Sequence, residues 1–336
     1  MRAPQKVPRK ATASRHPKSP AAAEAAALAA SGRHAQVIAV ASVALAAARI
    51  APPDRLDLLD LRAESHIALG DLDAAAADAQ AMLEAARRSR RPALLAQALS
   101  RRAYVEIRGG AARDAVGTAE SALQAARRAR HAHLEAIALL RLGEAQFRTR
   151  ENENAARTCA QAARMFKAAG QTAWEGRAWW AISAARSGQG RVEDGDRAAK
   201  RALALAQRAG DLHGIGNALN MLTFHEPDIG RCMRLLRQAL AAFEAAGYVE
   251  RQAVITHNLG NQYSNLGLYR RARRLFLQAG EAYRRAGSVG FGLPTRRRRG
   301  RPGNPARPFM MTCSPLRMTV AGSATGSPQR ARTRSG

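Results

Sequence analysis

A unit of about 40 residues recurs seven times along this chain, and a period of this length constrains the fold more than any other feature. The clearest copy reads "HNLGNQYSNLGLYRRARRLFLQAGEAYRRAG", residues 257–287. On each side of Gly267, apolar residues recur at steps of three and four, which predicts two helices joined by a short turn. The equivalent turn positions recur at nearly constant intervals and are Gly32, Gly70, Gly110, Arg150, Gly190, Pro227 and Gly267.

Small residues recur at fixed distances after each of these turns. Alanines or other small residues at a constant offset let neighbouring helices approach closely, so we expect these positions to be buried. Alanine is also the strongest helix former, and only 4% of the residues are aromatic. The composition therefore predicts an all-α fold of thin, closely packed helices. The residues five positions after each turn are Val37, Ala75, Ala115, Ala155, Gly195, Cys232 and Ala272, and those twelve positions after are Ala44, Met82, Ala122, Ala162, Ala202, Ala239 and Ala279.

The repeated unit resembles the tetratricopeptide repeat. The last copy carries the motif almost completely, as Leu259-Gly260, Tyr263, Gly267, Tyr269, Ala272, Phe276 and Ala279. The resemblance implies a right-handed superhelical solenoid of about seven antiparallel helix-turn-helix repeats over residues 21–287, with the first helix of each pair lining a concave groove. The units exceed the usual length of such a repeat, which is about 34 residues. In this they resemble the helical sensor arrays of bacterial signalling ATPases, transcription activators and nucleotide cyclases.

The net charge of +28 is concentrated at the two ends of the chain. Residues 1–20 carry six Lys or Arg and residues 288–336 carry ten Arg, and neither segment has an acidic residue. We expect both to be disordered basic tails. They favour an alternative function, nucleic-acid binding through the tails, and Arg299-Gly300-Arg301-Pro302 resembles an AT-hook core. Because the repeat pattern stops at residue 288 without a polar capping helix, we also expect the chain to be truncated or frame-shifted after residue 287.

No pattern of catalytic, cofactor-binding or metal-binding residues is present in the sequence. The three cysteines lie far apart, without the spacing of a zinc site, and indicate a reducing, cytoplasmic location. Gly214 and Gly216 lack the rest of a phosphate-binding motif, so we expect them to thin a helix at a close contact. The longest apolar run, residues 37–48, is too short to span a membrane. We therefore predict a protein that is not an enzyme and that has no cofactor, no metal and no membrane segment.

The resemblance places specific side chains in the concave groove. Arginine can grip a carboxylate with two hydrogen bonds, and asparagine can both donate to and accept from a peptide backbone. We therefore predict a protein or peptide partner, with acidic groups among its contacts. The alternatives are that these side chains only solvate helix faces, or that the chain is a regulatory fragment of a cyclase or transcription activator. The predicted groove residues are Arg101, Arg141, Arg177, Asn217, His257, Asn258, Asn261 and Asn265.

Overall fold

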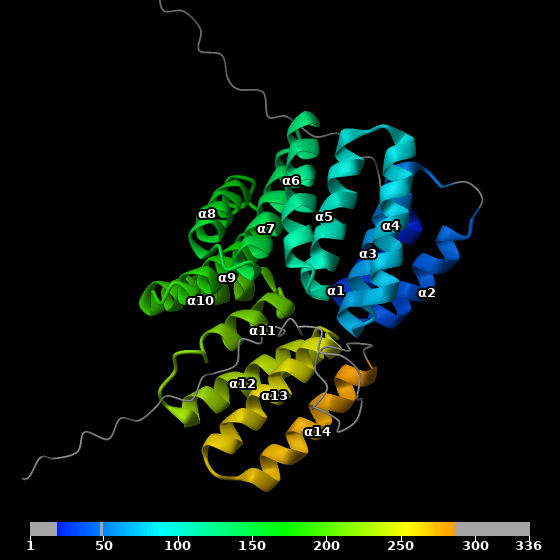
Figure 1. Ribbon diagram of the computed structural model, residues 1–336. Helices are drawn as coiled ribbons and strands as arrows, with labels where there is room; N and C mark the ends of the chain where they lie inside the picture. The colour runs from blue at the N-terminus through cyan, green and yellow to red at the C-terminus, as the bar shows by residue number, and fades with distance from the viewer. Residues whose placement is uncertain (1–18, 48–49, 286–336) are drawn as a thin grey trace, which may run out of the picture.

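The computed structural model describes residues 19–47 and 50–285, and every regular element in these two segments is an α-helix (Figure 1). Almost all of what was predicted for the two ends lies outside the described residues. This concerns the basic tails at residues 1–20 and 288–336, the Arg299–Pro302 motif and the expected truncation after residue 287. The helices are α1 (Pro20–Ala30), α2 (His34–Leu45), α3 (Pro52–Leu69), α4 (Leu72–Ser89), α5 (Pro92–Gly109), α6 (Ala112–Arg128), α7 (Ala132–Arg148), α8 (Asn152–Ala168), α9 (Thr172–Gly188), α10 (Val192–Ala209), α11 (Leu212–Met221), α12 (Ile229–Ala245), α13 (Val249–Asn265) and α14 (Tyr269–Arg285).

The helices pair into seven antiparallel hairpins, and the predicted solenoid is confirmed. Each turn position predicted from the sequence lies between the two helices of one hairpin. Six of the seven positions have a positive φ, the conformation that glycine adopts without strain. Arg150 takes this conformation with φ of 69° although it carries a side chain. The tight turn is therefore set by the packing of the two helices, and glycine only makes it easier.

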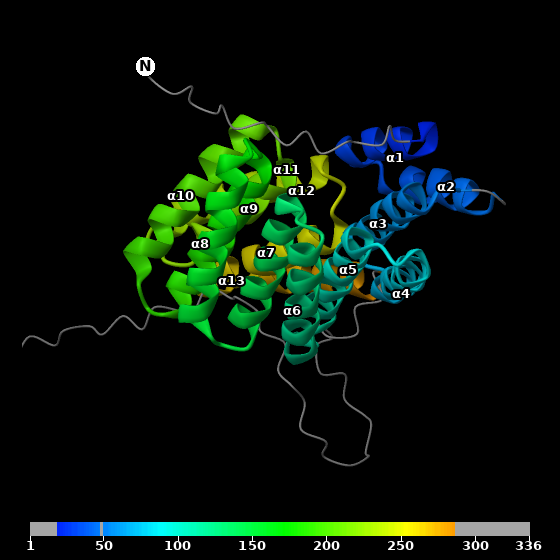
Figure 2. The same ribbon diagram turned by 90° about the horizontal axis from the view of Figure 1, so that it is seen from above.

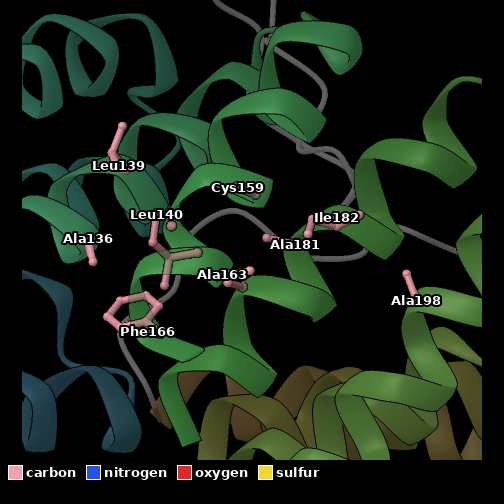
Figure 3. Close-up of a cluster of buried hydrophobic side chains, with 11 residues drawn as sticks. Ala136, Leu139, Leu140, Cys159, Ala163, Phe166, Ala181, Ile182 and Ala198 are labelled. Carbon is pink, nitrogen blue, oxygen red and sulfur yellow. The ribbon is translucent and has the colours of Figure 1, made fainter. Parts of the chain in front are cut away.

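The core of the array runs between consecutive helices and is made mainly of small side chains. Most of the predicted small residues are buried, including Ala75, Ala115 and Ala155 with no exposed surface. Figure 3 shows one such cluster, in which Leu140, Cys159 and Phe166 pack between α7, α8 and α9. A Cβ at Gly143 would lie 2.3 Å from the Cys159 Sγ. The glycine of the Leu-Gly motif therefore lies at a contact between α7 and α8 that leaves no room for a side chain.

The fifth hairpin departs from the regular pattern because α11 has only ten residues. Pro227 disfavours helix at the residue before it, and the chain runs through a loop before α12. Asp228 then begins α12 by accepting hydrogen bonds from the backbone N–H groups of Gly230 and Arg231. Gly216 on α11 lies against the Phe243 ring, and a Cβ on Gly216 would lie 2.7 Å from that ring. This agrees with the close helix contact predicted for this glycine.

The array curves until its last hairpin meets its first ones, so the first helices of the repeats surround a common interior (Figures 1 and 2). Helix α13 contacts α3, and the turn before α13 packs against the turn between α1 and α2. At this seam Gly32 and Gly247 meet backbone to backbone, since a Cβ on Gly247 would lie 2.2 Å from the Gly32 carbonyl oxygen. His34 Nε2 donates to the Ala246 carbonyl across 3.1 Å, and burial lowers the pKa of His34.

Within the described part of the chain, none of the helices combines the length and the apolar character that a bilayer crossing requires.

Candidate functional site

The curvature of the array forms a partly open chamber lined by six helices, α3, α5, α7, α9, α11 and α13. Its free volume is about 50 Å³, which is room for a few water molecules. Each of these helices is the first helix of its hairpin, as the tetratricopeptide resemblance implied for the groove-lining face. The lining residues are Glu64, Tyr104, Ile107, Arg108, Arg141, Glu144, Phe147, Arg148, Arg177, Trp180, Ala181, Ala184, His213, Gly214, Asn217 and Arg251.

One part of the chamber wall is a network in which every arginine has a matching carboxylate. Arg101 Nε donates to Asp60 Oδ1 across 2.6 Å, and its Nη1 pairs with Glu64. Tyr248 Oη, from the start of α13, donates to Glu64 Oε1 across 2.7 Å. Burial alone would raise the pKa of Glu64, but the charge and hydrogen bond of Arg101 hold it well below its usual range. Glu64 is therefore a permanent anion that ties α3 to α5 and to the seam.

Arg177 and Asp211 continue this network from α9 to the start of α11. The guanidinium makes two hydrogen bonds with the carboxylate, Nε to Oδ2 at 2.9 Å and Nη2 to Oδ1 at 3.2 Å. Asp211 also caps α11 by accepting from the Gly214 N–H. Burial and the charge of Arg177 lower the pKa of the neighbouring His213 to about 3, so its imidazole is neutral at physiological pH. We call Asp60, Glu64, Arg101, Arg177, Asp211 and Tyr248 the paired network.

Aromatic rings stack with the arginines along the wall. The Arg141 guanidinium carbon lies 4.0 Å from the centre of the Tyr104 ring, and Arg141 Nη1 donates to Glu144 Oε2 across 2.7 Å. The Arg177 guanidinium carbon lies 4.9 Å from the centre of the Trp174 ring. These stacks fix the planar guanidinium groups in the wall, because a ring face attracts a cation and restricts its rotation.

A second part of the wall gathers three arginines, Arg108 from α5, Arg148 from α7 and Arg251 from α13, which we call the arginine cluster. Glu250 pairs with Arg108, and its Oε2 lies 3.6 Å from Arg251 Nε. Burial, followed by the positive charges of Arg251 and Arg108, lowers the pKa of Arg148 to about 10. Burial and the charge of Arg108 lower the pKa of Arg251 in the same way. The cluster thus concentrates positive charge in an enclosed space.

Four of the eight predicted groove residues belong to the chamber wall. Arg141, Arg177 and Asn217 line the chamber, and Arg101 lies in the same wall, joined to Asp60 and Glu64. Asn217 Nδ2 lies 3.2 Å from a ring nitrogen of His213. The structure therefore brings together the predicted arginines from the second, third and fourth full repeats.

The other four predicted residues, all on α13, do not line the chamber. Asn258 is buried and donates from Nδ2 to Asn220 Oδ1 across 3.0 Å, so it joins two neighbouring hairpins. The His257 ring packs against Phe276 at a centroid distance of 5.0 Å, and burial lowers the pKa of His257. Asn261 and Asn265 lie further along α13, and Asn265 is exposed at its end. The register that places side chains of α5 to α11 in the chamber does not do so on α13, because only the first turn of α13 reaches the chamber.

Several chamber residues were not predicted from the sequence. Asp60 and Glu64 occupy the groove positions of the first full repeat, so the same register would have found them. Tyr248, Glu250 and Arg251 precede the groove positions of the last repeat, and they reach the chamber only because the array closes on itself. No local pattern signals such a closure.

The described residues contain no group of three His, Cys, Asp or Glu side chains that could hold a metal ion. Cys159 is buried, and burial raises the pKa of its thiol, so it is not poised as a nucleophile. The wall offers charged groups and the planar faces of guanidinium and aromatic side chains.

Comparison with protein-family models and with curated proteins gives no match. Comparison with solved structures finds helical repeat proteins. A Rap protein complexed with competence and sporulation factor is similar, with 13% identity, a TM-score of 0.60, and coverage of 81% of this chain and 78% of that one. The apo form of RapI has 10% identity, a TM-score of 0.59, and coverage of 80% and 97%. Aspartyl phosphate phosphatase F from Bacillus subtilis has 14% identity, a TM-score of 0.55, and coverage of 74% and 65%. At such identities the likeness concerns the fold.

Proposed function

We propose that this chain, which has the fold of tetratricopeptide-like repeat proteins, is a non-enzymatic interaction module that holds a segment of a protein or peptide partner in its chamber. The observation that carries the proposal is the composition of the wall, in which arginines and the rings of Tyr, Phe and Trp come from four of the six helices and face one cavity. Arginine and aromatic side chains dominate the energetics of protein recognition. An extended peptide offers carboxylates to the arginines and backbone groups to Asn217.

The small free volume bears on how a partner would enter. A cavity of about 50 Å³ accommodates one or two side-chain groups and no folded domain. A longer segment therefore requires the hairpins to separate slightly at the seam, where Gly32 and Gly247 meet. Each hairpin of a repeat array packs on its neighbours in the chain, whereas the seam joins hairpins that are far apart in the sequence. The seam is therefore the contact that can open while neighbouring hairpins stay packed.

The adjacent residues Trp179 and Trp180 offer a matched test. Trp180 lines the chamber, whereas Trp179 lies on another face, under the guanidinium of Arg201. The full chain is used to select peptides from a random displayed library, and their affinities are measured by isothermal titration calorimetry. We expect Trp180→Ala to weaken binding by about thirtyfold, the effect of losing an aromatic anchor of about 2 kcal/mol, and Trp179→Ala to change it less than threefold. Equal losses in the two variants, or no selected sequence, would contradict the proposal.

We further propose that the module is the sensor part of a bacterial signalling protein and that it acts in the cytoplasm. The length of the repeat unit and the resemblance to sensor arrays support this assignment. If it is right, the selected peptides should match a segment of a protein in the same cell, and a synthetic copy of that segment should compete for binding.

A second candidate function, nucleic-acid binding, follows from the charge of the tails. Residues 1–20 and 288–336 hold 16 of the 54 Lys and Arg residues and none of the 26 acids. Deleting residues 288–336 should abolish retention on DNA at about 150 mM salt if this is the function. Peptide binding in the chamber should survive the same deletion, so the two proposals are tested separately.

A further inference from the structure

A second cavity, larger than the chamber, lies on another face of α9. Helix α9 packs against both α8 and α10, and an open groove lies between these two second helices (Figure 1). Its free volume is about 700 Å³, against about 50 Å³ for the chamber. Trp179 and Ile182 of α9 line the groove, whereas their neighbours Trp180 and Ala181 line the chamber. The groove is therefore a separate surface, which the proposed function does not use.

The floor of the groove is apolar and contains a tryptophan. Trp179 occupies the position that Leu139 has in the preceding hairpin, 40 residues earlier. Leu139 is buried, with 3% of its surface exposed, whereas the larger indole of Trp179 is half-buried. The indole thus presents apolar surface to the groove, and tryptophans in such places anchor protein partners. The apolar residues that line the groove are Ala156, Ala160, Trp179, Ile182 and Ala198.

A basic rim surrounds this floor. One acid, Asp194, lines the groove together with five cations, and Glu193 and Asp196 of the same helix do not line it. The cations are Arg186, Arg191, Arg197, Lys200 and Arg201. Four of them have a carboxylate neighbour, since Asp194 pairs with Arg191 and Arg197, Glu175 with Arg201 and Glu153 with Arg186. Pairs exposed to solvent are weak, so the carboxylates of a partner can replace or join those of the protein.

The basic rim belongs to this groove and is not a general property of the repeat. In the preceding hairpin, four of the five corresponding positions, 40 residues earlier, carry no cation. They are Gln146, Glu151, Ala160 and Gln161, and the fifth is Arg157. Solvation gives no reason for this difference between two consecutive units, whereas electrostatic complementarity to an acidic partner does.

The shape of the groove suits a helix. The lining residues recur at steps of three and four, as Trp179, Ile182 and Arg186 do on α9. Each stripe is therefore about two turns, or about 10 Å, long. Another helix packs against such stripes at an axial distance of about 8–10 Å. An extended strand would find no backbone groups to pair with, because those of α8, α9 and α10 are bonded within their helices.

We propose that the groove between α8 and α10 binds an amphipathic helix of a partner protein, with apolar residues on Trp179 and Ile182 and with Asp or Glu along the basic rim. The tails of this chain cannot supply such a helix, because residues 1–20 and 288–336 contain no acid. The partner is therefore another protein, bound in the helix-in-groove manner.

The probe is a fluorescent, Ala-rich helical peptide of about 18 residues with Leu along one face and Glu on both sides of it. A second peptide carries Lys in place of Glu. Fluorescence anisotropy with the full chain at about 150 mM salt measures both affinities. We expect the acidic peptide to bind with a Kd below about 100 µM and the basic peptide to bind at least about tenfold more weakly.

Two variants give the groove the residues of the preceding hairpin, which suit the repeat. Trp179→Leu introduces the residue type of position 139, and Lys200→Ala that of position 160. We expect Trp179→Leu to weaken binding of the acidic peptide about tenfold and Lys200→Ala about threefold. Arg128→Ala, on the exposed end of α6, and Trp180→Ala, in the chamber, are the controls and should each change it less than about twofold. Thermal unfolding of each variant verifies that it folds.

The proposal is overturned if the acidic peptide does not bind, if the basic peptide binds as tightly, or if Trp179→Leu binds like the wild type. A DNA oligonucleotide that displaces the peptide and depends on Trp179 would assign the groove to nucleic acid and would overturn it as well. A loss in Trp180→Ala with no loss in Trp179→Leu would place the peptide in the chamber. That outcome supports the proposed function and removes the groove, whereas the reverse pattern supports the groove alone.

Discussion

The paired network and the arginine cluster both contain buried arginines. Carboxylates are in excess in the paired network, whereas arginines are in excess in the cluster. In the paired network, Arg101 faces Asp60 and Glu64, and Arg177 faces Asp211, so the carboxylates outnumber the arginines. In the arginine cluster, Arg108 and Arg251 share Glu250, and both of their charges act on Arg148. Both groups contribute to the wall of one chamber, and the centre of the Tyr104 ring lies 5.7 Å from the guanidinium carbon of Arg101 and 6.0 Å from that of Arg108.

The difference separates two uses of a buried arginine. A guanidinium with its own carboxylate links two helices and fixes the geometry of the wall, and it has little capacity left for a ligand. A guanidinium held beside other guanidinium groups is repelled by their charges, so it contributes less to the stability of the fold. Stability should therefore respond in opposite directions to substitutions in the two groups, and the following experiments test that contrast.

The largest effect is expected from breaking the paired network at Arg177. In Arg177→Met, the Asp211 carboxylate, of which 8% of the side chain is exposed, loses its cation while staying buried. Removing one partner of a buried ion pair costs about 3 kcal/mol or more, and we expect that loss in the free energy of unfolding measured with urea. The double variant Arg177→Met/Asp211→Asn should recover at least half of it, because asparagine still caps α11. A loss below about 1 kcal/mol in the single variant would mean that the network is not stabilising.

The next effect is a loss of stability at mildly acidic pH that arises from His213. Its pKa is about 3 in the folded chain and about 6.5 when unfolded. Its contribution is complete above pH 6.5 and falls as the pH drops, because the unfolded chain then binds a proton that the folded chain does not. Between pH 7 and pH 5 this amounts to a loss on the order of 2 kcal/mol.

The variant His213→Gln isolates this contribution. His34, His66 and His257 also have lowered pKa values, so they weaken the folded state in the same pH range in both proteins. The difference between wild type and variant, measured by urea unfolding at pH 7 and pH 5, reports His213 alone. Parallel curves for the two proteins would show that His213 titrates normally.

The sequence predicted the repeats and three of the residues that line the candidate site, because both depend on local periodicity. The turn positions and the buried small residues follow from helical spacing within one hairpin, as Ala115 and Gly267 illustrate. Arg141, Arg177 and Asn217 reach the chamber because each first helix presents the same face to the interior. A register read from one repeat therefore applies to its regular neighbours.

The rest of the site depends on how far the superhelix turns, which no local pattern encodes. Small rotations between successive hairpins add up until α13 meets α3, and only then do Tyr248 and Arg251 enter the chamber. Asn258 lies between two consecutive hairpins, where its amide donates to Asn220. The asparagines of the last repeat have the residue types of a peptide-binding surface, and none of them lines the chamber.

A smaller effect, opposite in sign, is expected in the arginine cluster. Arg148→Met removes one of three mutually repelling charges and keeps most of the apolar side-chain volume. We expect the free energy of unfolding to rise by on the order of 1 kcal/mol. Arg128→Met, on the exposed end of α6, should stay within about 0.5 kcal/mol of the wild type. A loss of stability in Arg148→Met would place Arg148 with the structural arginines and remove the contrast between the two groups.

The smallest effect is expected at Asn265, a predicted groove residue that lies apart from both groups. Its side chain is exposed at the end of α13, so Asn265→Ala should change the free energy of unfolding by less than about 0.5 kcal/mol. Since the residue does not line the chamber, the affinity for selected peptides should also stay within about twofold, in contrast to the loss expected for Trp180→Ala. A tenfold loss of affinity in Asn265→Ala would place the binding surface along α13. The difference between the paired network and the arginine cluster would then affect only the stability of the fold.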